Sequence, residues 1–125
     1  MSRILVIDDN ANIVALLRRV LERAGHDVRT TSDGPAGVRA FREHGADLII
    51  TDIYMPEQDG IETILQLRAL DVGVKIIAIS GGDQTETHDS LQVAALLGAV
   101  RTMPKPLDTA ELLGAVAKTL AEPPA

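Results

Sequence analysis

The sequence contains no cysteine and no tryptophan, and it has one phenylalanine, Phe41, and one tyrosine, Tyr54. Without cysteine the chain can form no disulfide and carry out no thiolate chemistry. Because large aromatic side chains are nearly absent, the core must be built from Val, Leu, Ile and Ala. These residues are plentiful: hydrophobic residues make up 46% of the chain, which is too much for a disordered protein.

Basic residues are also few, with 12 Lys and Arg against 18 Asp and Glu and a net charge of −6. Such a chain is a poor binder of nucleic acid, whose phosphates are neutralised by Lys and Arg. No apolar run approaches the roughly 18 residues of a membrane helix. Asp8 and Asp9 also follow Met1 too soon for a signal peptide. We therefore expect a cytoplasmic protein that contacts neither nucleic acid nor a membrane directly.

The 125 residues are enough for one compact domain. Short apolar runs rich in β-branched residues at 4–7, 48–50 and 76–79 predict buried strands, because parallel strands covered on both faces are apolar throughout. The runs at 28–30 and 100–103 are mixed with polar residues and predict edge strands. We expect the domain to span residues 1–121 and a short unstructured tail to follow at 122–125.

Amphipathic helical patterns lie between the strands. One apolar stripe includes Ile13, Leu17 and Leu21, and further patterns lie at 61–65 and 91–97. Asp108 predicts the N-cap of the last helix, with Glu111 three residues on. A glycine follows three of the helical runs, where a residue with positive φ commonly ends a helix: Gly25, Gly45 and Gly98.

Five strands that alternate with helices predict an α/β fold, (βα)5, with a doubly wound parallel sheet. With the two polar runs at the edges, the strand order is 2-1-3-4-5. This is the flavodoxin-like arrangement, in which ligands bind at the carboxyl ends of the strands near the switch point between the first and third strands.

Reactive side chains follow four of these strands. The first strand is followed by Asp8 and Asp9, the third by Asp52, the fourth by Ser80 and the fifth by Lys105. Taken singly, Asp9 could be a helix cap, Ser80 part of a turn and Lys105 a solvated charge. Together they place three carboxylates, a hydroxyl and an ammonium group at one edge of the sheet.

Such a cluster has a specific chemistry. Three close carboxylates repel one another unless a cation lies between them, and hard oxygen ligands without His or Cys suit Mg²⁺. The histidines, His26, His44 and His88, lie elsewhere in the predicted fold. A carboxylate beside Mg²⁺ and a lysine can attack a phosphoryl group and form an aspartyl phosphate.

Four motifs extend this interpretation: Ile-Leu-Val-Ile-Asp-Asp-Asn at 4–10, Asp-Ile-Tyr-Met-Pro-Glu-Gln-Asp-Gly at 52–60, Ile-Ala-Ile-Ser-Gly at 77–81 and Lys-Pro at 105–106. With them the chain resembles the receiver domains of two-component response regulators over essentially its whole length. The resemblance implies that Asp52 is the phosphoacceptor and that Mg²⁺ is held by Asp8, Asp9, Asp52 and the backbone carbonyl of Tyr54. Ser80 and Lys105 would contact the phosphoryl oxygens, and the Lys105–Pro106 bond would be cis.

The resemblance also implies partners. The phosphoryl donor would be a phosphohistidine on a sensor histidine kinase or a histidine phosphotransfer protein, and phosphorylation would alter binding to a downstream protein that the sequence does not identify. Such a domain is not an enzyme for other substrates, because it catalyses only its own phosphorylation and dephosphorylation.

Three features depart from the commonest receiver pattern. Thr102 stands where the switch usually has a Phe or Tyr, so output is expected to depend more on Ser80 and the loop after the fourth strand. That loop, at 80–86, is longer than usual. At the rim, Tyr54 and the side-chain-free Gly82 predict slow loss of the phosphoryl group.

Alternatives stay open. A haloacid-dehalogenase-type phosphatase also uses Asp, Mg²⁺ and Lys, but it carries Asp-x-Asp after its first strand, whereas here Asp8 and Asp9 are adjacent. The chain could be an N-terminal receiver module from a longer DNA-binding or enzymatic regulator, although we expect a stand-alone domain. A receiver that no longer switches and acts only as a binding scaffold is the third alternative.

Overall fold

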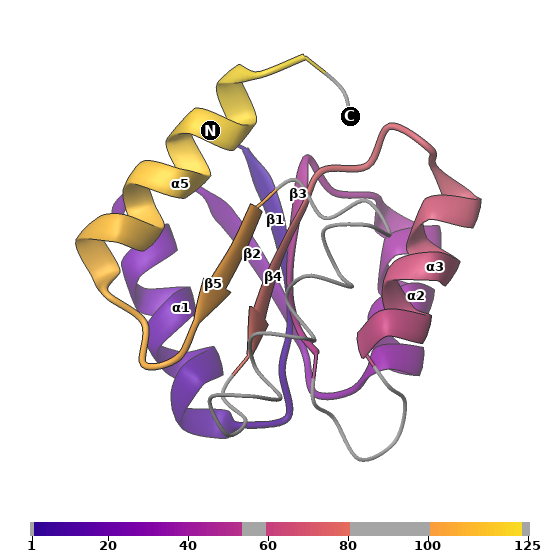
Figure 1. The fold of residues 1–125 in the computed structure, drawn as a ribbon, viewed down its shortest axis with the longest axis horizontal. Coiled ribbons are helices and arrows are strands. Elements are labelled where there is room, and N and C mark those ends of the chain that lie inside the picture. The colour runs from indigo at the N-terminus through magenta and orange to yellow at the C-terminus, as the bar shows by residue number, and fades with distance from the viewer. Residues whose placement is uncertain (1, 54–59, 81–100, 124–125) are drawn as a thin grey trace.

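The computed structural model describes residues 2–53, 60–80 and 101–123. A five-stranded parallel sheet, in the order β2-β1-β3-β4-β5, forms its centre (Figure 1). The elements are β1 (Arg3–Ile7), α1 (Ala11–Arg23), β2 (Asp27–Thr31), α2 (Gly34–His44), β3 (Leu48–Asp52), α3 (Gly60–Leu70), β4 (Ile76–Ser80), β5 (Arg101–Pro104) and α5 (Thr109–Ala121). The predicted fold class, strand order and edge strands are confirmed. The helix predicted at 91–97 and Gly98 lie outside the described residues.

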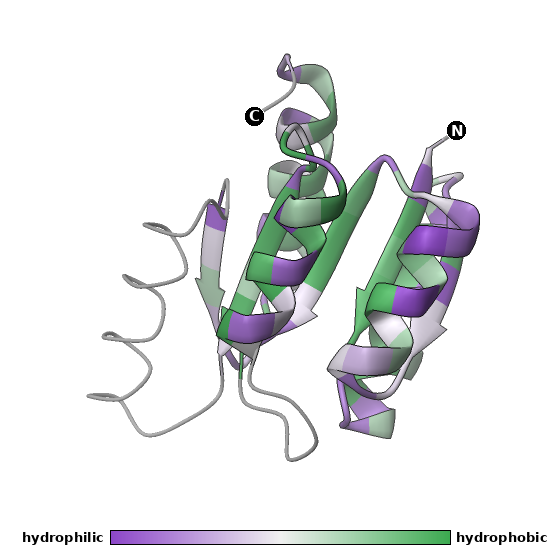
Figure 2. Ribbon diagram, turned by 90° about the vertical axis from the view of Figure 1, so that its right-hand side faces the viewer, coloured by the Kyte–Doolittle hydropathy of each residue, from purple (hydrophilic) through white to green (hydrophobic). Residues whose placement is uncertain are grey.

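The sheet is covered on both faces, and each face has its own apolar cluster (Figure 1). Figure 2 shows that hydrophobic residues predominate along the central strands. Helices α1 and α5 lie on one face, and α2 and α3 lie on the other. Alternate residues of β1 divide between them: Leu5 and Ile7 pack toward α2 and α3, while Ile4 and Val6 pack toward α1 and α5. Strands β3 and β4 are buried throughout, because parallel strands inside a sheet must be covered on both sides.

The described helices begin and end where local chemistry favours it. Asp108 caps α5, as predicted: its side-chain oxygen accepts a hydrogen bond from the Glu111 N–H at 3.0 Å. Gly25 and Gly45 have φ values of 94° and 69° after α1 and α2, as expected of residues that end helices. Helix α5 ends at Ala121, and the next residue, Glu122, forms a 2.8 Å ion pair with Arg101 of β5.

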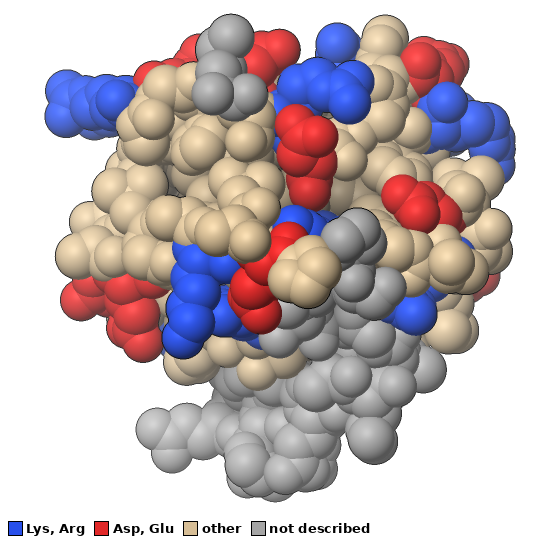
Figure 3. Space-filling view, turned by 90° about the horizontal axis from the view of Figure 1, so that it is seen from above, with Lys and Arg blue, Asp and Glu red and all other residues tan. Residues whose placement is uncertain are grey.

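The charged side chains are distributed over the surface. Seen from above in Figure 3, acidic and basic side chains are interspersed, and neither sign covers the whole face. Across the part of the chain that is described, no helix is long and apolar enough to cross a membrane.

Candidate functional site

The register of the sheet brings three strand ends together. Strands β1, β3 and β4 are neighbours, with Ile7 paired to Thr51 and Asp52 paired to Ile79. Asp8 therefore leaves the sheet beside Asp52, and Ser80 ends the next strand along. The sequence predicted that these residues meet where the carboxyl ends of the strands lie together, and their positions in the structure agree with this prediction.

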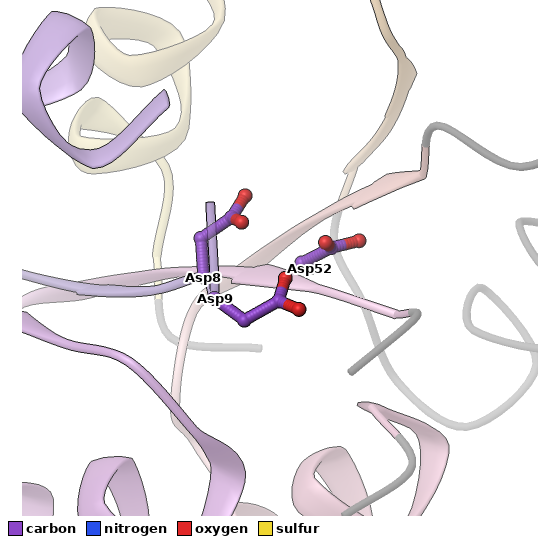
Figure 4. Close-up of side chains that lie close together, drawn as sticks. All are labelled: Asp8, Asp9 and Asp52. Atoms are coloured by element: carbon purple, nitrogen blue, oxygen red, sulfur yellow. The ribbon is translucent and has the colours of Figure 1, made fainter. Parts of the chain in front are cut away.

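Three carboxylates form the centre of this edge. Asp8, Asp9 and Asp52 each offer one carboxylate oxygen, and these oxygens all lie within 4.8 Å of one another (Figure 4). Asp8 and Asp52 are only 1% and 3% exposed, whereas Asp9 is exposed to solvent. The cluster thus has two buried carboxylates and one that is exposed to solvent.

Asn10 holds the end of β1 in place. Its backbone N–H donates to Asp8 Oδ1 at 2.9 Å, and its own side-chain oxygen accepts from the N–H groups of Asn12 and Ile13. Asn10 is therefore the N-cap of α1. The reading of Asp9 as a helix cap is wrong, and its carboxylate stays with the acidic cluster. An Asn directly before the first apolar stripe of a helix was the signal that sequence reasoning missed.

Lys105 supplies the positive charge of the site. Its Nζ lies 3.1 Å from Asp52 Oδ2 and 3.1 Å from Asp8 Oδ2. Its backbone N–H donates to the Ser80 carbonyl at 2.8 Å, and the Lys105–Pro106 peptide bond is cis, as expected. Burial works to lower the pKa of Lys105, but the charges of Asp52 and then Asp8 outweigh it, so the pKa is raised from 10.5. The ammonium group therefore remains charged at neutral pH.

Ser80 is fully buried at the end of β4. Among the described residues its Oγ has no hydrogen-bond partner. A buried hydroxyl without a partner is destabilising by about 1–3 kcal/mol. Native proteins tolerate such a group mainly where a ligand, ion or water can satisfy it. Ser80 is therefore a candidate donor to a group bound at this edge of the sheet.

The donor set fits Mg²⁺. All three side chains are carboxylates, and magnesium prefers oxygen ligands in octahedral geometry. Adjacent ligands of such an ion lie about 3 Å apart, so the observed spacing within 4.8 Å needs only small side-chain movements or a bridging water. The Lys105 ammonium group neutralises Asp8 and Asp52, and its charge would compete with the ion.

The remaining predicted residues are distributed differently. Thr102 is half-buried on β5, where it pairs with Ala78 of β4. Tyr54, Gly82 and residues 81–86 of the long loop lie outside the described ranges. Their predicted roles at the metal site and at the rim stay predictions.

Comparison with known proteins gives a consistent result. The profile of the response regulator receiver domain family matches residues 4–117. Chemotaxis protein CheY of Bacillus subtilis is 33% identical over 120 residues, which cover 94% of this chain and 97% of CheY. A CheY-like receiver domain structure from Methanospirillum hungatei aligns with a TM-score of 0.88 at 25% identity, covering 96% of this chain and 94% of that one.

Longer proteins match as well. The transcriptional regulator NtrC of Rhizobium meliloti is 33% identical over 122 residues, but the match covers 98% of this chain and only 25% of NtrC. The regulator PhoP of Bacillus subtilis is 38% identical, and this chain spans 45% of its length.

Proposed function

The chain belongs to the response regulator receiver domain family, and from this premise we propose that it is a phosphorylation-dependent switch whose phosphoacceptor is Asp52. The observation that carries the proposal is the position of the Asp52 carboxylate: it is buried, 3.1 Å from the Lys105 ammonium group, and within 4.8 Å of Asp8 and Asp9 oxygens. Domains of this family are generally signalling modules rather than enzymes for other substrates.

In the proposed reaction a carboxylate oxygen of Asp52 attacks the phosphorus of a phosphohistidine. The new P–O bond forms as the P–N bond breaks, and the imidazole leaves with the electron pair and takes up a proton. Asp8, Asp9 and Asp52, with the backbone carbonyl of Tyr54, would hold Mg²⁺, which when bound neutralises charge on the transferred group. Lys105 would pair with the phosphoryl oxygens, and the Ser80 hydroxyl would donate to one of them.

A test of the phosphoacceptor uses acetyl phosphate, Mg²⁺ and intact mass spectrometry. The wild-type protein is expected to gain one hydroxylamine-labile phosphoryl group, and Asp52→Asn is expected to gain none, because an amide cannot act as the nucleophile. If Asp52→Asn took up the group as fast as the wild type, Asp52 would not be the phosphoacceptor. If neither protein gained mass and neither bound Mg²⁺, the chain would be a binding scaffold.

The donor would be a sensor histidine kinase or a histidine phosphotransfer protein. A cleft of about 570 Å³ lies beside Asp8 and Asp9, between α1 and the segment that follows β2. Its walls include Ala11, Val14 and Ala15, small apolar side chains that leave room for a partner helix next to the site. An apolar cleft beside a charged centre supports docking of the donor histidine at this edge.

Output is proposed to depend on Ser80 and the loop after β4, because Thr102 carries no ring that could turn between buried and exposed positions. The substitution Thr102→Tyr is expected to change binding of the downstream partner and its dependence on phosphorylation. The measurement is partner affinity with and without phosphorylation. Unchanged affinity in both states would show that this side chain does not limit the switch.

We also expect the aspartyl phosphate to be long-lived. Tyr54 is proposed to restrict the access of water to the phosphoryl group, while Gly82 provides no side chain to orient that water. Phosphate loss is therefore expected to be slow, and Tyr54→Asn is expected to accelerate it. Decay of the phosphorylated mass over time measures this, and a rapid decay in the wild-type protein would contradict it.

Two organisations remain proposals for the natural protein. Similarity over nearly the full length of CheY supports a stand-alone switch. Similarity to a quarter of NtrC and to about half of PhoP supports a receiver module of a longer regulator. In both cases the downstream partner is a protein surface that recognises the phosphorylated state.

A further inference from the structure

A groove of about 480 Å³ is lined by residues of β2, the strand at one edge of the sheet. In the described sheet β2 has one neighbour, β1. The groove is lined by consecutive residues of β2 and by side chains from the start of β1, from α1 and from the end of α2. The groove shares Arg18 and Thr30 with the cleft beside Asp8 and Asp9, but none of the three clustered carboxylates lines it.

Backbone groups of β2 are available at this edge. The Asp27 N–H donates to the Ser2 carbonyl, and the Thr31 carbonyl accepts from the Asp8 N–H, so both residues turn their backbone groups toward β1. Residues of a parallel strand alternate between its two neighbours. The backbone N–H and C=O groups of Val28 and Thr30 therefore point outward, where an additional strand would bond.

The charged side chains that line the groove are more often basic than acidic. Arg3, Arg18 and Arg29 line it with the exposed His44 and the acidic Asp27. Arg3 already forms an ion pair with Asp47 at 3.9 Å, so Arg18 and Arg29 supply most of the available positive charge. Arg29 pairs with Leu5, so it lies on the α2 face of the sheet, while Arg18 reaches the other face and donates to Thr30 Oγ1 at 3.1 Å. Positive charge thus flanks the edge strand from both faces.

This local charge is opposite to that of the chain as a whole, which carries −6. Charges farther apart than about 8 Å are screened at physiological ionic strength. A partner at the groove would therefore respond mainly to the charges close to it, which are Arg18, Arg29, Asp27 and the Arg3–Asp47 pair.

We propose that this groove is a docking site for an extended acidic segment of another protein, which adds to the sheet beside β2. Main-chain hydrogen bonds to Val28 and Thr30 would align the segment, and its carboxylates would pair with the arginines on either side. A second copy of this chain fits the edge less well, because pairing β2 with β2 would bring like-charged arginines together.

The probe is an N-acetylated peptide in which glutamate alternates with valine, titrated into the ¹⁵N-labelled, unphosphorylated protein without Mg²⁺ and followed by NMR. The Val28 and Thr30 amide signals are expected to shift and to become protected from solvent exchange. Arg29→Glu is expected to weaken binding about tenfold, since it replaces an attraction by a repulsion. Lys118→Glu, which makes the same change in net charge on exposed α5, is expected to leave affinity within about twofold.

Several outcomes would overturn the proposal. A peptide with lysine in place of glutamate could bind as tightly as the glutamate peptide. Arg29→Glu and Lys118→Glu could weaken binding of the glutamate peptide equally, or the amide signals of Val28 and Thr30 could fail to shift. Tighter binding of oligothymidylate would assign the groove to nucleic acid instead. If the arginines only prevent edge-to-edge aggregation, Arg29→Glu would leave peptide binding unchanged. The result does not depend on Asp52, because no phosphoryl donor is present.

Discussion

Replacing Lys105 by methionine is expected to slow phosphoryl uptake from acetyl phosphate by about 100-fold or more, while Mg²⁺ binds about tenfold more tightly. The loss of rate follows from removing a preorganised charge at the transferred group, which typically costs 10²–10³ in rate. The gain in affinity has a different cause. Lys105 Nζ lies 3.1 Å from oxygens of both Asp8 and Asp52, so its charge repels a metal ion that would share those carboxylates.

The same substitution is expected to lower stability in EDTA. Asp8 and Asp52 have side chains that are 0% and 4% exposed, and without the ammonium group they would be left close together without their cation. Removing one partner of a fully buried pair costs 3–5 kcal/mol. Because the Lys105 side chain is 17% exposed, solvent screening reduces this, and we expect a loss of about 2–3 kcal/mol. Added Mg²⁺ should raise the Tm of Lys105→Met more than that of the wild type.

The measurements are the phosphorylation rate by mass spectrometry, Mg²⁺ titration and thermal unfolding in EDTA or Mg²⁺. Lys118→Met serves as the matched control, because Lys118 lies exposed on α5 and should affect none of the three. Slower phosphorylation with unchanged Mg²⁺ affinity and unchanged Tm would mean that Lys105 acts only on the phosphoryl group and does not neutralise the carboxylates.

The fold was predictable because its signals are local. The runs at 4–7, 48–50 and 76–79 are apolar on both faces, and the structure extends each by at most two residues. The edge position of β2 followed from polar residues within its run, since only an edge strand leaves side chains partly exposed. The five side chains of the site were predictable for a related reason: parallel strands end at the same edge of a sheet, so residues after each strand must meet there.

What sequence reasoning missed depends on distances between segments. The double pairing of Lys105 with Asp8 and Asp52 needs the relative positions of β1, β3 and β5, which no local pattern contains. The groove at β2 likewise brings together Arg3, Arg18 and Arg29. These residues belong to three different elements, so no single helical or strand pattern in the sequence contains more than one of them. Nothing in the sequence around Gly37 indicates why a glycine is needed there. The reason is its close approach to Ile7 of β1, which leaves no room for a Cβ.

The second large effect is therefore expected at Gly37. This glycine is buried on α2, and a Cβ placed there would overlap Ile7 Cδ1 and lie 2.7 Å from Ile7 Cγ1. Ile7 is fully buried at the end of β1 and has little room to move. Overpacking typically costs 1–3 kcal/mol. The helix propensity of alanine recovers about 1 kcal/mol at most, so Gly37→Ala should destabilise the protein by about 1–2 kcal/mol in urea unfolding.

The strain should also reach the site, because Ile7 directly precedes Asp8. Gly37→Ala is expected to weaken Mg²⁺ binding. Gly114 lies on an exposed turn of α5, where an added Cβ would meet no described atom within 4 Å apart from its own helix backbone, so Gly114→Ala should stabilise the protein by up to about 1 kcal/mol. Ile7→Val removes the atom nearest to the new Cβ. In a double-mutant cycle it should therefore reduce the cost of Gly37→Ala by about 1 kcal/mol. Additive costs would show that the two side chains do not collide, and unchanged Mg²⁺ affinity in Gly37→Ala would show that the strain does not reach the carboxylates.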